Sequence, residues 1–309
     1  MTTGSELKYK IDHMQSLIGT GVAVVTPFAV NKEVDFPSLK KVIHHLIKGG
    51  VEYLVVMGTT GEAATLSKAE ERKVIDFFFE EVEGKLPIVL GIGGNDTKRV
   101  GEKITEFSGI YKETEAILSV SPYYNKPSQE GIYQHYASLA SSTDLPLILY
   151  NVPGRTSSNI SAETTLKLAY DFANVVATKE ASGNIAQIME IIKGKNEDFL
   201  VLSGDDNMSL PMISLGGSGT ISVSANAFPL RFSEMVRAAL NGDWAKAREL
   251  NYQLLPMMKL HFQEGNPSGV KMAMALQGLC EPQVRLPLVK ATEGLKAQIS
   301  AHLAPMIGK

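Results

Sequence analysis

Lys179 is the residue whose surroundings most clearly suggest chemistry in this 309-residue sequence. It stands near the end of a β-branched apolar run, VVATKEA, in which alternation places Val175, Ala177 and Lys179 on one face. Small neighbours leave room for the long side chain, and an amine partly withdrawn from water holds its proton less tightly. Such an amine can attack a carbonyl and form a Schiff base. The alternative is a lysine whose ammonium simply reaches solvent at a strand end.

Other apolar runs end in phenols, hydroxyls and a guanidinium. Tyr150 and Tyr124 could relay protons to and from a carbinolamine, although half-buried packing is the commoner role of an isolated tyrosine. Thr59 and Thr60 lie between two glycines, where backbone N–H groups can approach an anion, and a glycine turn with a helix cap is the alternative. Arg155 could bind a carboxylate through two parallel hydrogen bonds, or form a surface ion pair.

The patterns of three other chemistries are incomplete. The glycines of Gly91–Gly94 begin like a dinucleotide-binding fingerprint, but Asp96 occupies the third glycine position. Gly217–Gly219 does not complete a nucleophile elbow. His44 and His45 are adjacent on an expected helix and point about 100° apart, so they are not a metal-binding pair. We therefore expect no metal site.

The elements that position these residues recur along the chain. Eight short apolar runs alternate with segments of helical periodicity, which is typical of a parallel sheet covered on its faces. Eight such units favour a closed (β/α)8 barrel, whose active site lies at the carboxyl ends of the strands. A doubly wound open sheet is the alternative. The runs are residues 21–28, 53–58, 87–93, 116–122, 146–153, 175–181, 199–204 and 219–226.

Three regions are expected along the chain. Residues 1–18 are expected to form an N-terminal tail, and residues 19–230 a (β/α)8 catalytic barrel. The strand pattern stops after Asn226, and residues 231–309 are expected to form an all-α C-terminal domain. Three helices are expected there, at residues 232–242, 243–263 and 269–279.

Composition excludes several kinds of protein. A net charge of −3 gives no electrostatic reason to expect nucleic acid or an anionic membrane as a partner. The one cysteine, Cys280, cannot form a disulfide within the chain, which favours a reducing compartment. The first residues lack the apolar core of a signal peptide, and no window approaches the roughly 20 apolar residues that span a bilayer. We therefore expect a cytoplasmic protein.

Six motifs occur in order, each near the end of an expected strand: VTPF, GTTGEAATL, VSPYYNKPSQEG, YNVPGRT, KEASGN and SGDD. Together they resemble the dihydrodipicolinate synthase and N-acetylneuraminate lyase family of pyruvate-dependent class I aldolases. The resemblance extends from about residue 19 to the C-terminus. It implies a barrel enzyme that needs no cofactor and assembles as a homotetramer, a dimer of dimers.

The resemblance also implies roles for individual residues. Lys179 matches the Schiff-base lysine, and Tyr150 matches the tyrosine that shuttles protons beside it. Thr59 and Tyr124 match the other members of a hydroxyl relay, with Tyr124 reaching in from a neighbouring subunit.

The positions that match substrate contacts are Thr60, Arg155, Gly204 and Ile221. Thr60 corresponds to a contact of the pyruvate carboxylate, while Gly204 and the Ile221 carbonyl line the pyruvate pocket. Arg155 matches the arginine that binds the carboxylate of a second substrate, and sialic-acid lyases usually lack it. The double threonine is also typical of the synthases.

The resemblance therefore implies condensation of pyruvate with L-aspartate-4-semialdehyde to 4-hydroxytetrahydrodipicolinate, in lysine and diaminopimelate biosynthesis. An aldolase of a 2-keto-3-deoxy sugar acid or of N-acetylneuraminate is the alternative. Two further alternatives are an inactive ligand-binding barrel and a metal-dependent aldolase. The matching site residues argue against the first, and the absence of ligand patterns argues against the second.

In this family, lysine binds at a dimer interface and inhibits the enzyme. At two positions the sequence departs from the pattern: Lys68 stands where a histidine is common, and Arg99 where an acid usually pairs with the ligand amine. A cation in place of an acid turns attraction into repulsion unless another acid compensates. The positions that match the allosteric pocket are Ala64, Glu71, Gly93, Asn95 and Tyr123.

Overall fold

The structure is a computed structural model that describes residues 15–307. Its eight strands follow one another in chain order in a closed parallel barrel. The predicted (β/α)8 barrel is confirmed, and the open-sheet alternative is wrong. The strands are β1 (Gly19–Ala23), β2 (Tyr53–Val56), β3 (Ile88–Gly91), β4 (Thr114–Val120), β5 (Leu147–Asn151), β6 (Val175–Glu180), β7 (Leu200–Ser203) and β8 (Gly219–Ser222).

The described residues divide into two compact units. The β3–β8 unit comprises residues 15–18 and 87–221, and the β1–β2 unit comprises residues 19–86 and 222–307. The domain boundary expected between residues 230 and 231 falls inside the helix α10 (Pro229–Leu240) and stays a prediction.

The expected tail, residues 1–18, lies mostly outside the described residues, which begin at residue 15. Of its last residues, Leu17 is fully buried. The Ser16 hydroxyl donates to the Glu115 carboxylate in β4 at 2.5 Å. Residues 16 and 17 therefore already pack with the β3–β8 unit.

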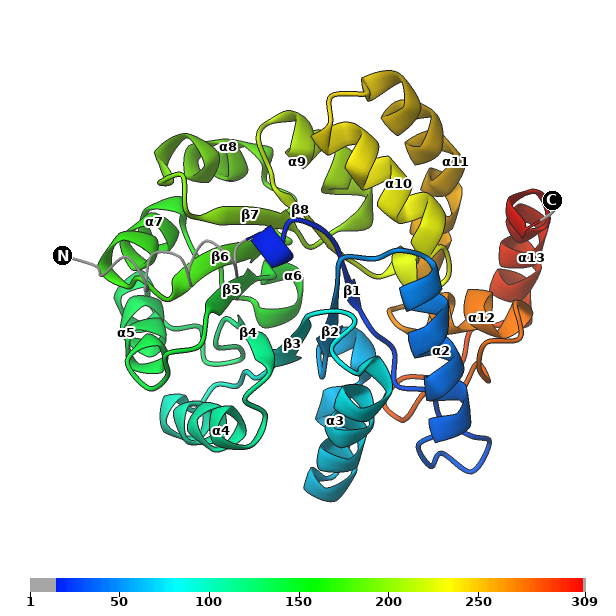
Figure 1. The fold of residues 1–309 in the computed structure, drawn as a ribbon, viewed down its shortest axis with the longest axis horizontal. Helices are drawn as coiled ribbons and strands as arrows, with labels where there is room; N and C mark the ends of the chain where they lie inside the picture. Colours follow the sequence, from blue (N-terminus) through cyan, green and yellow to red (C-terminus); the bar gives the residue numbers. More distant parts are fainter. Residues whose placement is uncertain (1–14, 308–309) are drawn as a thin grey trace. The chain divides into compact units, whose positions relative to one another are not determined.

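In the β3–β8 unit, the helices α4, α5, α7 and α8 lie outside the strands (Figure 1). Every residue of β5 and β6 is buried, as expected of strands covered on both faces. The α5 helix is fixed to β4 by the Tyr136 hydroxyl, which donates to the Ser119 carbonyl at 2.9 Å. The helices of this unit are α4 (Thr97–Ile110), α5 (Gln129–Ala140), α6 (Pro153–Thr156), α7 (Ala162–Asp171), α8 (Ile185–Gly194) and α9 (Ser209–Ser214), with the short 3-10 helix η3 (Asp206–Met208).

Side-chain caps explain where the outer helices of this unit begin. The side chain before each helix accepts a hydrogen bond from a backbone N–H of the first turn, which would otherwise have no partner. An apolar face then faces the sheet: in α8, Ile188 and Ile191 are buried. The capping residues are Asp96 before α4, Ser128 before α5, Ser161 before α7 and Asn184 before α8.

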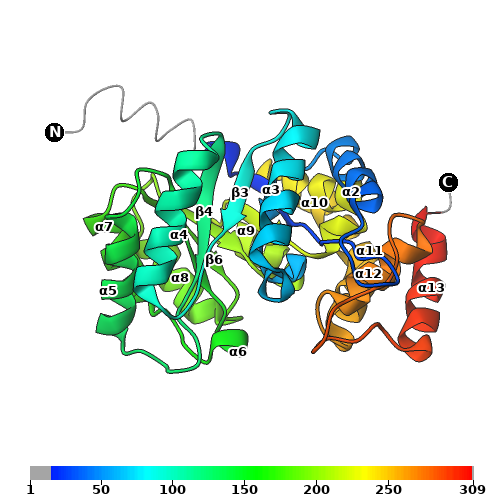
Figure 2. The ribbon, with the colours of Figure 1, turned by 90° about the horizontal axis from the view of Figure 1, so that it is seen from below.

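The β1–β2 unit combines two strands with longer helices. Its C-terminal helices α11, α12 and α13 pack on one another (Figure 2). The three helices expected after residue 231 correspond to α10, α11 and α12, whereas α13 was not among them. The helices are α2 (Phe36–Lys48), α3 (Lys68–Val82), α10, α11 (Trp244–Gln263), α12 (Ser268–Leu276) and α13 (Glu293–Ile307), with the 3-10 helices η1 (Thr59–Gly61), η2 (Ala63–Thr65) and η4 (Ser224–Asn226).

Candidate active site

Lys179 and Tyr150 lie side by side near the carboxyl ends of β6 and β5. They are direct partners in the parallel register of these two strands. Lys179 is only 5% exposed, and its Nζ lies 4.2 Å from the centroid of the Tyr150 ring. The alternative of an ammonium that reaches solvent does not fit this burial. The structure thus brings together an amine that can form a Schiff base and a phenol that can transfer protons.

Gly204, directly after β7, makes room for the lysine side chain. A Cβ at this position would lie 2.7 Å from the Ala181 Cβ and 3.1 Å from the Lys179 Cε. Any other residue would therefore displace the lysine or the strand. Ile221, also expected at the pyruvate pocket, is fully buried in β8.

The Lys179 amine has no hydrogen bond or ion pair in the part of the chain that the structure describes. The positive charge of Lys179 affects the pKa of Asp205, which follows Gly204. Burial raises the pKa of Asp205 to about 6, and the negative charge of Asp206 acts in the same direction. The positive charges of Lys179 and Arg155 act against this rise. Asp205 was predicted only as part of the SGDD motif, without a role.

Glu180 is a buried carboxylate that the sequence reasoning missed. It is 1% exposed, and alternation along β6 turns it away from Lys179. The Asn151 and Gln187 side-chain amides each donate to it at 3.1 Å, and the Ser182 backbone N–H donates at 2.8 Å. These bonds tie the ends of β5 and β6 together behind the two site residues. The signal in the sequence was an acid directly after Lys179 in the run VVATKEA.

Arg155 and Tyr124 are both exposed. Arg155 lies in α6, directly after β5, and forms no ion pair with the other described residues. The surface ion pair considered as an alternative is therefore not found. Tyr124 follows β4, is 86% exposed, and has a left-handed backbone with φ of 75°. A large aromatic side chain held in such an uncommon conformation is characteristic of functional loops.

Thr59 and Thr60 form the start of η1 in the β1–β2 unit. Thr60 is 2% exposed, and its Oγ1 accepts a hydrogen bond from the Asn266 side-chain amide at 2.9 Å. Thr59 is exposed, and its hydroxyl has no hydrogen-bond partner among the described residues. Gly58, before this 3-10 helix, has no side chain that could cap it, so the capped turn considered as the alternative is not found at this position.

The residues matched to the allosteric pocket fall into both units. In the β3–β8 unit, the Asn95 side-chain amide donates to the Tyr123 carbonyl at 3.4 Å. The Gly93 position cannot carry a side chain, because a Cβ would lie 2.7 Å from Val120 Cγ1. Arg99 forms an exposed ion pair with Asp96 at 3.2 Å. Ala64 and Glu71 belong to the β1–β2 unit, where Ala64 is exposed.

Two kinds of feature are absent from residues 15–307. No group of three or more histidine, cysteine or acidic side chains there could hold a metal ion. No helix in the same residues has both the length and the apolar character to cross a membrane. The expectation that the protein needs no metal stays a prediction.

Comparisons with known proteins agree with the geometry. The model of the Dihydrodipicolinate synthetase family matches residues 16–305. A 4-hydroxy-tetrahydrodipicolinate synthase of Flavobacterium psychrophilum is 51% identical over 286 residues, which is 93% of this chain and 97% of that protein.

Two solved structures have the same fold. A monomeric dihydrodipicolinate synthase variant is 38% identical, with a TM-score of 0.91, over 94% of this chain and 97% of its own. A dihydrodipicolinate synthase from Cyanidioschyzon merolae with lysine bound is 36% identical, with a TM-score of 0.88, over 93% and 97%. The chain therefore belongs to the dihydrodipicolinate synthetase family.

Proposed function

We propose that the protein condenses pyruvate with L-aspartate-4-semialdehyde to give 4-hydroxytetrahydrodipicolinate, on the route to diaminopimelate and lysine. The observation that carries this proposal is the buried Lys179 amine, without an ion pair among the described residues, against the Tyr150 ring. Relatives named for this reaction support it over cleavage of a sugar acid.

The reaction follows from the chemistry of these two side chains. The Lys179 amine adds to the pyruvate carbonyl, and loss of water gives an iminium. The iminium withdraws electrons from the neighbouring methyl group, so a methyl proton can pass to Tyr150 and leave an enamine. The enamine carbon then attacks the aldehyde, whose oxygen takes up a proton. The amine of the second substrate finally attacks the iminium carbon, closes the ring and releases Lys179.

The other site residues complete the proposal on the family resemblance. Thr59 and Tyr124 pass the proton between Tyr150 and solvent. Thr60 holds the pyruvate carboxylate, and Arg155 holds the carboxylate of the second substrate. The absence of an ion pair at Arg155 within residues 15–307 supports its part, since the guanidinium keeps its donors for a ligand. Gly204 and the Ile221 carbonyl line the pyruvate pocket.

The decisive experiment is reductive trapping. Treatment with pyruvate and borohydride should convert the imine to a stable secondary amine and add one reduced pyruvate to Lys179, seen by peptide mass spectrometry. An unmodified Lys179 would contradict the proposal. Turnover of aspartate semialdehyde compared with sugar acids separates the synthase from the sugar-acid aldolase.

We also propose a homotetramer in the cytoplasm. The exposed Tyr124 ring supports an assembly in which a neighbouring subunit covers it. The monomeric variant among the solved structures means that the assembly has to be measured. Light scattering together with activity at decreasing concentration provides this measurement, and full activity of a monomer would contradict the proposal.

Feedback inhibition by lysine is the last part of the proposal. The related enzyme with lysine bound supports it, as does the contact between Asn95 and Tyr123. The cation at Arg99 disfavours a ligand amine, but its ion pair with Asp96 reduces this repulsion. Titration of lysine at subsaturating pyruvate is the test. Inhibition that Tyr123→Ala relieves would support this pocket, and no inhibition at millimolar lysine would end the proposal.

A further inference from the structure

Glu62 occupies an unusual position directly after the Thr59–Gly61 turn. It is 4% exposed and has a left-handed backbone, with φ of 54°, between η1 and η2. Its backbone N–H donates to the Thr59 carbonyl at 3.1 Å, and its own carbonyl accepts from the Thr65 N–H at 3.0 Å. A non-glycine residue is rarely left-handed, so the surroundings must fix it.

The Glu62 carboxylate is held at both oxygens by groups from the C-terminal part of the β1–β2 unit. The Lys271 ammonium donates to Oε1 at 2.5 Å, and the Arg285 backbone N–H donates to Oε2 at 2.9 Å. The Glu62 and Lys271 side chains are 1% and 0% exposed, respectively. The carboxylate therefore cannot turn without breaking a fully buried ion pair.

The partners of Glu62 are themselves fixed. Lys271 also donates to the Gln283 carbonyl at 2.9 Å, and its Nζ lies 4.3 Å from the centroid of the Phe28 ring. The Arg285 guanidinium lies 4.4 Å from the same centroid. Phe28 thus contacts both cations through its ring.

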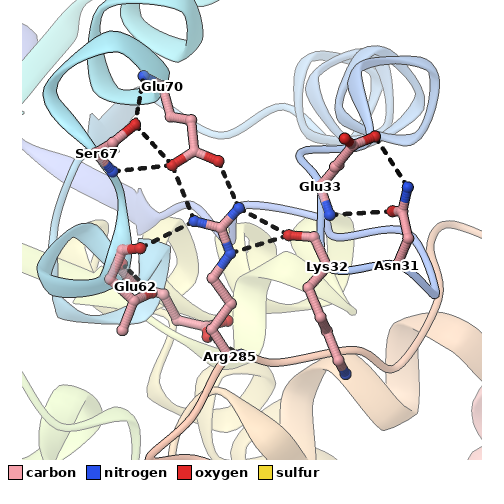
Figure 3. A network of polar contacts seen from close by, with 8 residues as sticks. Asn31, Lys32, Glu33, Glu62, Ser67, Glu70 and Arg285 are labelled. Atoms are coloured by element: carbon pink, nitrogen blue, oxygen red, sulfur yellow. Dashed lines mark hydrogen bonds and ion pairs between the residues drawn. The ribbon is translucent and has the colours of Figure 1, made fainter.

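The Arg285 guanidinium also fixes the far end of the same segment (Figure 3). It donates to the Thr65 carbonyl at 2.9 Å, to the Lys32 carbonyl at 2.7 Å and to both Glu70 oxygens, at 2.5 and 3.0 Å. Residues 62–65 are therefore held by hydrogen bonds at their beginning and at their end.

On its other side, the turn is held by neutral groups. Asn266 donates to the Thr60 hydroxyl at 2.9 Å, and the Thr26 hydroxyl donates to the Gly61 carbonyl at 2.6 Å. These contacts position Thr60 and Gly61 directly. The bond from the Glu62 N–H to the Thr59 carbonyl is the contact that reaches Thr59 itself.

Stability alone does not explain a buried ion pair at this place. Replacing such a pair by apolar residues of similar volume is often neutral or stabilising, because both charges lose their hydration. The pair instead fixes the orientation of the Glu62 carboxylate, because a buried charge that lost its partner would raise the free energy of every other arrangement.

We propose that Glu62, with Lys271 as its counter-charge, is a positioning residue that fixes the Thr59 hydroxyl for proton transfer. The proposal rests on the proposed function, in which Thr59 belongs to the proton relay. It makes the C-terminal helix α12, which carries Lys271, part of the machinery that sets the rate of the reaction.

The test is the double variant Glu62→Gln/Lys271→Met, in which the charge pair is replaced without leaving a buried unpaired charge. We expect its melting temperature to stay near that of the wild type, because no charge is left without a partner. We expect kcat to fall by about tenfold to a hundredfold, since a small misplacement of a reacting group has effects of this size. KM for pyruvate should change much less.

A matched control comes from a second carboxylate of the same unit. Glu52, directly before β2, also accepts at both oxygens, from the Arg237 guanidinium at 2.7 Å and from the Thr20 backbone N–H of β1 at 2.6 Å, but its side chain and that of Arg237 are 25% and 40% exposed. Glu52→Gln/Arg237→Met should leave kcat within about twofold of the wild type. An equal fall of kcat in both double variants would overturn the proposal.

Hydrogen exchange provides a readout that needs no substrate. The Gly61 and Glu62 amides, which donate within the turn, should exchange at least about tenfold faster in Glu62→Gln/Lys271→Met than in the wild type or the control. Unchanged exchange would overturn the positioning role even if kcat fell. If the wild type is not trapped by pyruvate and borohydride, the proposed function fails, and the exchange rates still decide whether Glu62 fixes the turn.

Discussion

Two buried lysines, one in each unit, differ in the partners of their amines. Lys179 is 5% exposed and lies 4.2 Å from the Tyr150 ring, while Lys271 is fully buried and lies 4.3 Å from the Phe28 ring. Burial and an aromatic neighbour are thus common to both. The difference is the carboxylate: Glu62 contacts Lys271 at 2.5 Å, and no acid forms an ion pair with Lys179 among the described residues.

The lysine without an acid partner among the described residues is the one to which the proposed reaction assigns the Schiff base. Burial lowers the pKa of Lys271, and the charge and hydrogen bond of Glu62 oppose this shift and keep the ammonium in place. Next to Lys179, the Glu180 carboxylate points away from the amine and accepts hydrogen bonds from the Asn151 and Gln187 side chains. The amine is therefore left available for a carbonyl substrate.

The largest expected effect is the loss of turnover when Lys179, the proposed Schiff-base lysine, is replaced. Lys179→Ala should lower turnover on the order of 10³-fold or more, because no other described amine lies against Tyr150. The measurement is the rate of condensation, with borohydride trapping as a second readout. Lys271→Met is the control: it should still be trapped by pyruvate at Lys179. Trapping at another lysine in Lys179→Ala would show that the comparison was drawn between the wrong residues.

A second prediction concerns the free energy of unfolding, which only the variant at Lys271 should lower. Lys271→Met leaves the Glu62 charge buried without its counter-ion, and should lower the free energy of unfolding by about 3–5 kcal/mol. Lys179→Met removes an amine that forms no ion pair with any described residue, and should leave that free energy unchanged or raise it by about 1 kcal/mol. Urea unfolding measures both. Equal destabilisation by the two variants would mean that Lys179 has a structural partner after all.

A third prediction separates the two halves of the proposed reaction. Arg155→Ala should impair the use of aspartate semialdehyde, since each charge-assisted hydrogen bond contributes roughly 1.5–3 kcal/mol. That corresponds to a loss of roughly 10- to 150-fold per bond in kcat/KM for this substrate. Formation of the pyruvate imine, measured by trapping at Lys179, should be almost unchanged. Equal damage to both steps would assign Arg155 to the structure.

The sequence was sufficient for the barrel and for the position of Lys179 near a strand end, because both depend on local patterns. Apolar runs predict strands, and the strand end predicts where a polar side chain can act. The same kind of pattern was present for α13, in which Leu295, Ile299 and Leu303 are buried at every fourth residue. That helix could have been predicted.

The Glu62–Lys271 pair could not have been predicted in the same way. Its two residues are 209 positions apart, and the Arg285 amide is 223 positions from Glu62. Lys271 stands in an apolar segment, VKMAMAL, where the pattern indicates only a core helix. Which acid pairs with it depends on the packing of the folded chain, and a single sequence contains no signal of that pairing. The left-handed backbone of Glu62 is likewise a result of its surroundings.

The smallest expected effect sharpens the comparison with a third charge pair, Arg285–Glu70, which is partly exposed. Hydrogen bonds from Arg285 lower the pKa of Glu70 to about 2 from its ordinary 4.5, and hydrogen bonds from Ser67 add to this shift. Because the folded state lowers the pKa, the pair stabilises the protein at pH values above about 4.5, and this contribution is lost as the pH falls towards 2. The Glu70 side chain is 31% exposed, so solvent screening leaves about 1 kcal/mol of the effect.

The free energy of unfolding of Glu70→Gln should thus be about 1 kcal/mol lower than that of the wild type near neutral pH, and the two values should become equal in acid. Urea unfolding at a series of pH values measures the difference, and a difference that persists at about pH 2 would show that Glu70 acts through packing rather than through its charge.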